Sequence, residues 1–264
     1  MELPKELQNA WYSIILEQIS QLLFDDKRVY AFWVEGSIAQ GKSDEYSDLD
    51  LWASIDNDLE DEMFAKVEKI LLSHGKLDIN YLMPIPHPEI FHTVYHIEGT
   101  SEFQTIDMNL QHNSRVFMMD EGVDDYLMIF DRAEVVKSLK PKAKVVDWAE
   151  TMDRVQQYYA LQHPNIMKNI NRGRPLEAKI YYDYLVQYLV KTIRLRDTPD
   201  KVDYGFKHSY RELRKEDLDF IQGVAFVNGK EDMLDGLNRM KQFIESYKEE
   251  MKIHIKSNNA NIKA

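Results

Sequence analysis

Two stretches decide the fold of this chain: Ala31-Phe-Trp-Val-Glu-Gly36-Ser37 and, ten residues later, Ser47-Asp48-Leu49-Asp50-Leu51. The first predicts a strand that ends in a Gly-Ser turn, and the second predicts a strand that carries two carboxylates. Because residues i and i+2 of a strand point to the same face, we expect Asp48 and Asp50 to lie side by side. Two carboxylates held that close repel each other, and a hard divalent cation relieves the repulsion.

The Gly-Ser turn adds a second chemical feature. Gly36 lets backbone N–H groups approach an anion, and the hydroxyl of Ser37 supplies a further donor. Lys42 and Ser47, in or next to the segment between the turn and the acidic strand, are candidates to reach the outer phosphates of a nucleotide. Cation ligands and phosphate donors in one place favour nucleotide chemistry.

The pattern hydrophobic-Gly-Ser, a ten-residue gap and then Asp-hydrophobic-Asp-hydrophobic resembles the nucleotidyltransferases of the DNA polymerase β superfamily. Within that superfamily, the chain is similar to the small bacterial enzymes that adenylylate aminoglycoside or lincosamide antibiotics. The motif and the strand order carry the resemblance over residues 28–130, and a looser similarity continues into the C-terminal half. The resemblance implies Mg²⁺-dependent transfer of a nucleoside monophosphate, by analogy AMP from ATP, to a hydroxyl group with release of pyrophosphate.

The resemblance also implies a third carboxylate on a neighbouring strand. Four residues are candidates for it: Asp107, Asp78, Glu98 and Glu102. Asp107 is favoured because Ile106 and Met108 flank it in the hydrophobic-Asp-hydrophobic form expected. Asp78 has a similar setting, and the two glutamates flank an expected hairpin turn, where related enzymes have a glutamate that serves as the base.

From this resemblance, the expected catalytic residues and Mg²⁺ ligands are Asp48, Asp50 and Asp107. The expected nucleotide-binding residues are Gly36, Ser37, Lys42 and Ser47. Hydrophobic periodicity predicts strands at 29–34, 49–55, 76–83, 91–97 and 103–111, the last two pairing as a hairpin. It predicts helices at 5–24 and 58–73, and a short helix or loop at 38–47.

The character of the sequence changes near Arg132. Long helical patterns follow at 143–169, 175–196, 210–222 and 230–254, with no further strand. We therefore expect an α/β (α+β) nucleotidyltransferase domain with a mixed sheet at residues 1–131, followed by an all-α helical bundle at 132–264 that binds the substrate.

The helix predicted at 175–196 carries four tyrosines and several cationic side chains, all within residues 181–196. Its tyrosines could stack on an adenine or line an acceptor pocket, and Lys191, Arg194 or the nearby Lys201 could approach the triphosphate. The alternative is that the tyrosines pack in the core and the cations complement the helix dipole.

The acidic residues are concentrated in the N-terminal half. Residues 1–130 contain 8 Lys+Arg against 25 Asp+Glu, a net charge of −17, whereas residues 131–264 contain 25 against 20. An acidic half argues against a nucleic-acid polymer as the substrate, because phosphate backbones require a basic track. It favours a cationic acceptor through electrostatic steering, although surplus acid can also serve only solubility.

Composition and the lack of certain motifs exclude several other classes of protein and of metal site. The chain has 264 residues and 44% hydrophobic residues, enough for a folded core, and its lack of cysteine excludes disulfides and thiolate metal sites. The scattered histidines lack zinc-like spacing, and no P-loop or Rossmann glycine pattern occurs. With no long apolar run and no signal-peptide layout, we expect a cytoplasmic protein without a membrane partner, either a monomer or a homodimer.

The sequence therefore leaves three candidate functions. The leading one is an adenylyltransferase that acts on a small, cationic acceptor such as an aminoglycoside, with a lincosamide or a metabolite as other acceptors. The second keeps the chemistry and moves it to a protein side chain. The third is a non-catalytic protein that retains the fold and binds a nucleotide or a partner.

Overall fold

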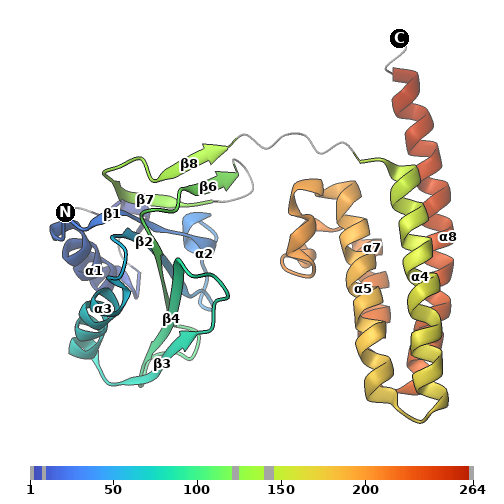
Figure 1. The fold of residues 1–264 in the computed structure, drawn as a ribbon, viewed down its shortest axis with the longest axis horizontal. Coiled ribbons are helices and arrows are strands. Elements are labelled where there is room, and N and C mark those ends of the chain that lie inside the picture. Colours follow the sequence, from blue (N-terminus) through green and yellow to red (C-terminus); the bar gives the residue numbers. More distant parts are fainter. Residues whose placement is uncertain (1–2, 8–9, 121–124, 140–145, 262–264) are drawn as a thin grey trace. The chain divides into compact units, whose positions relative to one another are not determined.

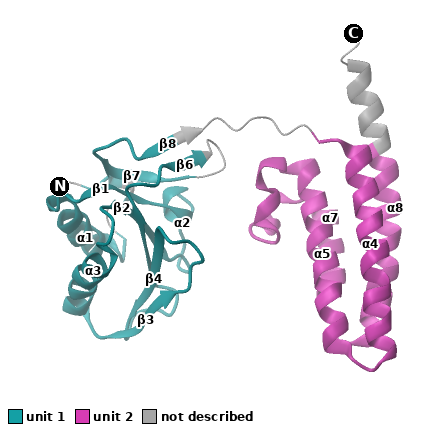
Figure 2. Cartoon of the chain, in the orientation of Figure 1, with its two compact units in different colours: residues 1–141 teal, residues 142–264 magenta. Residues whose placement is uncertain are grey.

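A six-stranded mixed sheet organises the N-terminal half of the chain (Figure 1). The computed structural model describes residues 3–7, 10–120, 125–139 and 146–261. It divides the chain into unit 1, residues 1–141, and unit 2, residues 142–264 (Figure 2). The elements of unit 1 are η1 (Lys5–Leu7), α1 (Ser13–Asp25), β1 (Val29–Val34), α2 (Gly36–Ala39), β2 (Leu49–Ile55), α3 (Glu60–His74), β3 (Leu77–Met83), β4 (Ile90–Ile97), β5 (Ile106–His112), β6 (Phe117–Asp120), β7 (Leu127–Asp131) and β8 (Val136–Leu139).

The strand order of the sheet is β3-β4-β5-β2-β1-β7. Only β2 and β5 run parallel, and every other neighbouring pair in this sheet is antiparallel. A parallel pair needs a long crossover, which here consists of α3, β3 and β4. The crossover brings β5 next to β2, and the mixed sheet that the sequence predicts is thereby confirmed.

The two faces of β2 are covered differently. Leu49, Leu51 and Ala53 are fully buried in the main hydrophobic core, which α1 and α3 complete on one side of the sheet (Figure 1). On the opposite face Trp52 stacks on Trp33, with ring centroids 5.9 Å apart. A smaller cluster covers that part of the sheet with residues of the second, two-stranded sheet, β6–β8: Phe117, Met119 and Val136.

Local patterns predict most of unit 1 correctly. The strands at 29–34 and 49–55 are confirmed residue for residue, and the expected hairpin is the antiparallel pair of β4 and β5. The helix expected at 5–24 is wrong in its first half: α1 begins at Ser13, because Leu3 and Leu7 enter the core through a separate 3-10 turn.

The expectation that no strand follows Arg132 is wrong. Val136–Leu139 forms β8, which pairs in parallel with β6 and extends unit 1 beyond that residue. Neither β6 nor β7 was expected, because each is short and pairs with a segment distant in the chain.

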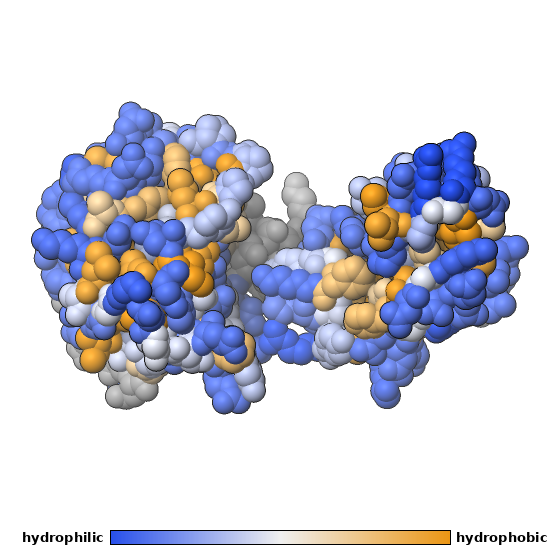
Figure 3. Space-filling view, turned by 90° about the horizontal axis from the view of Figure 1, so that it is seen from below, coloured by the Kyte–Doolittle hydropathy of each residue, from blue (hydrophilic) through white to orange (hydrophobic). Residues whose placement is uncertain are grey.

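Strand β3 lies at an edge of the six-stranded sheet, and its Ile79, Tyr81 and Leu82 are exposed. Apolar side chains gather on the surface of unit 1, next to hydrophilic ones (Figure 3).

Unit 2 is helical throughout its described part, as expected. Its elements are α4 (Trp148–Asn171), α5 (Pro175–Asp197), η2 (Pro199–Tyr204), α6 (Ser209–Glu212), α7 (Lys215–Ala225) and α8 (Lys230–Asn261). The single helix expected at 210–222 is wrong, because an extended Leu213 separates α6 from α7. No helix in the described part of the chain combines the length and the apolar character that a membrane crossing requires.

Candidate metal centre

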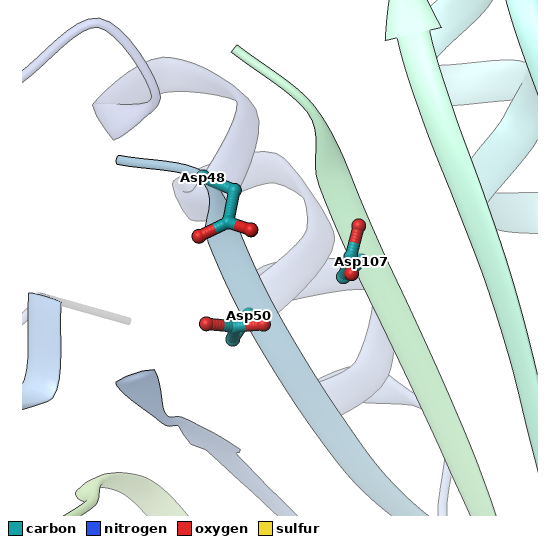
Figure 4. Close-up of side chains that lie close together, drawn as sticks. All are labelled: Asp48, Asp50 and Asp107. Carbon is teal, nitrogen blue, oxygen red and sulfur yellow. The ribbon is translucent and has the colours of Figure 1, made fainter. Parts of the chain in front are cut away.

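Strand pairing brings three carboxylates together at one end of the parallel pair. Asp50 of β2 is the register partner of Asp107 of β5, and Asp48 lies two residues before Asp50 on the same face. Each residue offers a carboxylate oxygen, and these oxygens all lie within 4.8 Å of one another. Figure 4 shows the three side chains projecting from the two adjacent strands. The expectation that Asp48 and Asp50 lie side by side is confirmed in its geometry.

The three half-buried carboxylates form a cluster of like charges. Burial raises the pKa of Asp107, a nearby His92 opposes the rise, and the charge of Asp48 adds to it. Burial and the neighbouring acid therefore disfavour ionised Asp107. Carboxylate oxygens are the ligands that Mg²⁺ and Mn²⁺ prefer, and a bound cation would remove the repulsion. The donor set therefore fits a divalent cation held by Asp48, Asp50 and Asp107.

The turn before the acidic strand is shaped around one of these carboxylates. Gly36 has φ +72°, and a Cβ atom placed there would lie 2.0 Å from Asp50 Oδ2. The backbone N–H of Glu35 donates to the carbonyl oxygen of Asp50 at 3.0 Å, which fixes the turn to β2. Gly36 was expected to make room for a phosphate. The structure gives it a further role, because the space where a side chain would start is occupied by the Asp50 carboxylate.

The remaining expected nucleotide-binding residues have different surroundings. Ser37 Oγ is shielded from solvent and has no hydrogen-bond partner among the described residues. A buried hydroxyl in that state costs about 1–3 kcal/mol, and a ligand oxygen would satisfy it. Lys42 is exposed. Ser47 Oγ donates to Asp44 Oδ1 and accepts from Asp44 N–H, both at 2.9 Å, so this hydroxyl already stabilises the loop before β2.

The other candidates for the third carboxylate do not join this group. Asp78, on the edge strand β3, pairs with His96 at 2.6 Å. Glu98 forms an exposed ion pair with Lys76 at 2.9 Å. Glu102 is exposed in the segment before β5. Among the described residues, only Asp107 joins Asp48 and Asp50 in a cluster that could hold a metal ion.

The ion pair between His96 and Asp78 should make the stability of the protein depend on pH. His96 has a raised pKa because its Nδ1 pairs with Asp78, with a further contribution from the carbonyl of Ser101, 2.9 Å from Nε2. Protonated His96 therefore stabilises the fold fully below the unfolded pKa of 6.5, and this stabilisation is lost as the pH rises through the folded pKa. We expect NMR titration of the ring to give a pKa above 6.5.

His96→Gln should remove this part of the slope of unfolding free energy against pH. The control is His74→Gln, because His74 is exposed and contacts only a neutral partner, Gln18, in the described hydrogen bonds. A His96 ring that titrates at or below 6.5 would contradict the assignment.

Sequence reasoning missed His92 as a neighbour of the acidic cluster. His92 lies on β4, and its Nε2 is 3.4 Å from Asp107 Oδ2. The sequence indicates this neighbour only weakly. Alternation along β4 puts His92 on one face of that strand, but the pairing of β4 with β5, which brings that face level with Asp107, cannot be deduced from local sequence.

The candidates of unit 2 are largely engaged within that unit. Arg194 is fully buried and holds Glu212 at 2.7 Å and the carbonyl of Gly205, so its expected approach to a triphosphate is wrong. Lys201 also pairs with Glu212, at 2.9 Å. Lys191 is half-exposed and lies 3.6 Å from an Asp203 oxygen.

Of the four tyrosines on α5, three serve packing, and one of these, Tyr181, is partly buried against the core of unit 2. The buried Tyr182 donates its hydroxyl to the carbonyl of Val224 at 2.7 Å. Tyr188 stacks on Tyr158, with ring centroids 4.3 Å apart. Tyr184, in contrast, is exposed.

Comparisons with known proteins add little. No protein-family model and no curated protein sequence matches this chain. One similar solved structure is a cytoplasmic RNA terminal U-transferase, with 16% identity and a TM-score of 0.26, over 37% of this chain and 29% of that one. Another is JHP933 from Helicobacter pylori, with 11% identity and a TM-score of 0.26, over 98% of this chain and 100% of that one. This chain thus spans under a third of the U-transferase chain, and similarities this low establish no function for it.

Proposed function

We propose that this chain transfers AMP from ATP to a hydroxyl group of a small, cationic acceptor and releases pyrophosphate. The observation that carries the proposal is the convergence of Asp48, Asp50 and Asp107 beside the Gly36 turn. Those three carboxylates would hold divalent cations, Mg²⁺ by preference. Bound there, the cations neutralise charge at the transferring phosphoryl group and on the leaving pyrophosphate.

The reaction needs a base as well as cations. The acceptor oxygen forms a bond to the α-phosphorus of ATP, and the bond from that phosphorus to the oxygen that bridges the α- and β-phosphates breaks, so that this oxygen leaves with pyrophosphate. The hydroxyl proton must leave the acceptor during this exchange. Asp107 is the candidate that accepts it, because it is a half-buried carboxylate that lies beside the two other acids.

The Gly-Ser turn supports binding of the phosphates. The hydroxyl of Ser37 has no hydrogen-bond partner among the described residues, and Lys42 is exposed on the loop that follows. A hydroxyl donor and an exposed ammonium group suit the β- and γ-phosphates, which carry most of the charge of ATP. Ser47 contributes indirectly in this proposal, by holding the loop that leads into Asp48.

The acceptor class follows from charge and from the resemblance. Residues 1–130 carry a net charge of −17, which attracts a cationic acceptor and disfavours a nucleic-acid polymer as the acceptor. An aminoglycoside combines several ammonium groups with several hydroxyls, and a lincosamide is the other acceptor that the resemblance suggests. A protein side chain as the acceptor is the second candidate, and it uses the same three carboxylates.

Pyrophosphate release from ATP and Mg²⁺ tests this proposal. The panel contains aminoglycosides, lincosamides and plain buffer, with the double variant Asp48→Asn/Asp50→Asn as the blank. A signal that depends on one antibiotic class is the expected result. Silence across the panel with Mg²⁺-dependent ATP binding intact would contradict an antibiotic acceptor and favour a protein or metabolite acceptor. The loss of Mg²⁺-dependent ATP binding as well would contradict the enzymatic function itself.

A further inference from the structure

His92 approaches the acidic cluster from a third strand. β4 pairs with β5 on the side away from β2, so Asp107 lies between the histidine strand and the strand of Asp48 and Asp50. The His92 side chain is 17% exposed, and its Nε2 lies 3.4 Å from Asp107 Oδ2. That nitrogen is shielded from solvent and forms no hydrogen bond within the described residues.

The arrangement leaves one polar atom unsatisfied and one carboxylate able to satisfy it. A hydrogen bond from an imidazole N–H to a carboxylate is about 2.7–2.9 Å long, so a small rotation of either side chain closes the contact. His92 is not itself one of the group that could hold a metal ion, which consists of the three aspartates alone. Its geometry therefore favours action through Asp107 and not direct contact with the cation.

We infer that His92 is a positioning residue for Asp107: its Nε2–H donates to Oδ2 and turns the other carboxylate oxygen toward the cation. The inference rests on the proposed function, because it assigns His92 to the same metal centre. Asp48 and Asp50 lie on one strand and face the same way, whereas Asp107 alone comes from β5. The strand that orients Asp48 and Asp50 therefore does not orient Asp107, and a hydrogen bond to Asp107 would fix its carboxylate separately.

Outer-shell hydrogen bonds of this kind typically change metal affinity by about 10–100-fold. His92→Phe keeps a flat ring of similar volume and removes the donor. His92→Gln keeps an N–H donor that can reach nearly the same position. We expect His92→Phe to weaken Mn²⁺ binding by about 10–100-fold, and His92→Gln to retain most of the affinity.

The experiment uses the full chain and Mn²⁺ alone, with free Mn²⁺ measured by EPR and the fold checked by circular dichroism. His112→Phe is the matched control. His112 lies at the end of β5 and its Nε2 contacts another carboxylate, that of Glu60 at 3.2 Å, away from the three aspartates. The control should leave Mn²⁺ affinity unchanged even where it lowers stability.

A double-mutant cycle separates positioning from general damage to the structure. If His92 acts only through Asp107, His92→Phe costs no further affinity in an Asp107→Asn background. Equal losses in both backgrounds would overturn the inference. Pulsed EPR adds a spectroscopic readout: a signal from a nitrogen bound directly to Mn²⁺ would make His92 a ligand and would also overturn it.

Failure of the inference can be distinguished from failure of the proposed function. If Asp48→Asn abolishes Mn²⁺ binding and His92→Phe binds as wild type, the metal centre stands and the role of His92 is wrong. If Asp48→Asn binds Mn²⁺ as tightly as wild type, the metal centre itself is wrong and the inference falls with it. Equal losses for the Phe and Gln variants would show that the donor is not what matters.

Discussion

Gly36→Ala is expected to lower the rate of pyrophosphate release by about 100-fold, because displacing a catalytic group by an ångström has effects of that size. The new Cβ would lie 2.0 Å from Asp50 Oδ2, well inside any tolerable contact, so either the carboxylate or the turn must move. A shift of the carboxylate takes Asp50 away from Asp48 and Asp107, and a shift of the turn displaces the proposed phosphate-binding residues, so either movement disturbs the site. The measurement is the initial rate at saturating ATP and Mg²⁺, with Mn²⁺ affinity measured in parallel.

Gly41→Ala is a closely matched control for this variant. Gly41 also has a left-handed φ, +63°, so alanine suffers comparable backbone strain there, about 1–2 kcal/mol. A Cβ atom at Gly41 meets nothing within 4 Å. Gly41→Ala should therefore lose some stability but keep Mn²⁺ affinity. Equal loss of Mn²⁺ affinity in the two variants would mean that backbone strain, and not the contact with Asp50, explains the result.

Asp48→Asn should lower the rate of pyrophosphate release more than Gly36→Ala does, and it should raise the stability of the metal-free protein. Removal of a ligand at a metal centre that stabilises the transition state should reduce turnover on the order of 10³-fold or more. Without metal, the same change should raise the free energy of unfolding at neutral pH, because the charge of Asp48 disfavours ionised Asp107. Initial rates, and denaturant unfolding in the presence of EDTA, give the two quantities.

Glu45→Gln controls for the change in net charge. Glu45 is exposed in the loop before β2 and is not part of the aspartate cluster. The Glu45→Gln variant should keep both the rate of pyrophosphate release and the free energy of unfolding near their wild-type values. An Asp48→Asn protein that keeps a near-normal rate would contradict the metal assignment, and one that is destabilised in EDTA would contradict the repulsion among the acids.

The parts of unit 1 that the sequence predicts well depend on local patterns. β1 and β2 are apolar segments bounded by clear turn residues, and the alternation in β2 alone places Asp48 and Asp50 on one face. The position of Asp107 beside them depends on β5 pairing in parallel with β2 across a long crossover. Asp107 and Asp78 share the hydrophobic-Asp-hydrophobic pattern, and only the strand order, which places β5 and not β3 beside β2, separates them.

Other features of the site could not be predicted, because they depend on non-local pairing. The pair of β6 and β8 joins two segments of four residues each, too short for a sequence period to identify them as strands, and it covers the Trp33–Trp52 stack. The contact between the Gly36 position and Asp50 requires the tertiary geometry of the turn. The approach of His92 to Asp107 requires the exact register of β4 on β5.

The most direct test of the metal centre is an anomalous-scattering map from crystals of this protein grown with Mn²⁺ and a non-hydrolysable ATP analogue. We expect a strong Mn²⁺ peak bound by Asp48, Asp50 and Asp107, with the phosphates of the analogue on the Gly36-Ser37 side. Density for the analogue at another surface, or a fully occupied Mn²⁺ peak elsewhere with none among these three carboxylates, would contradict the account.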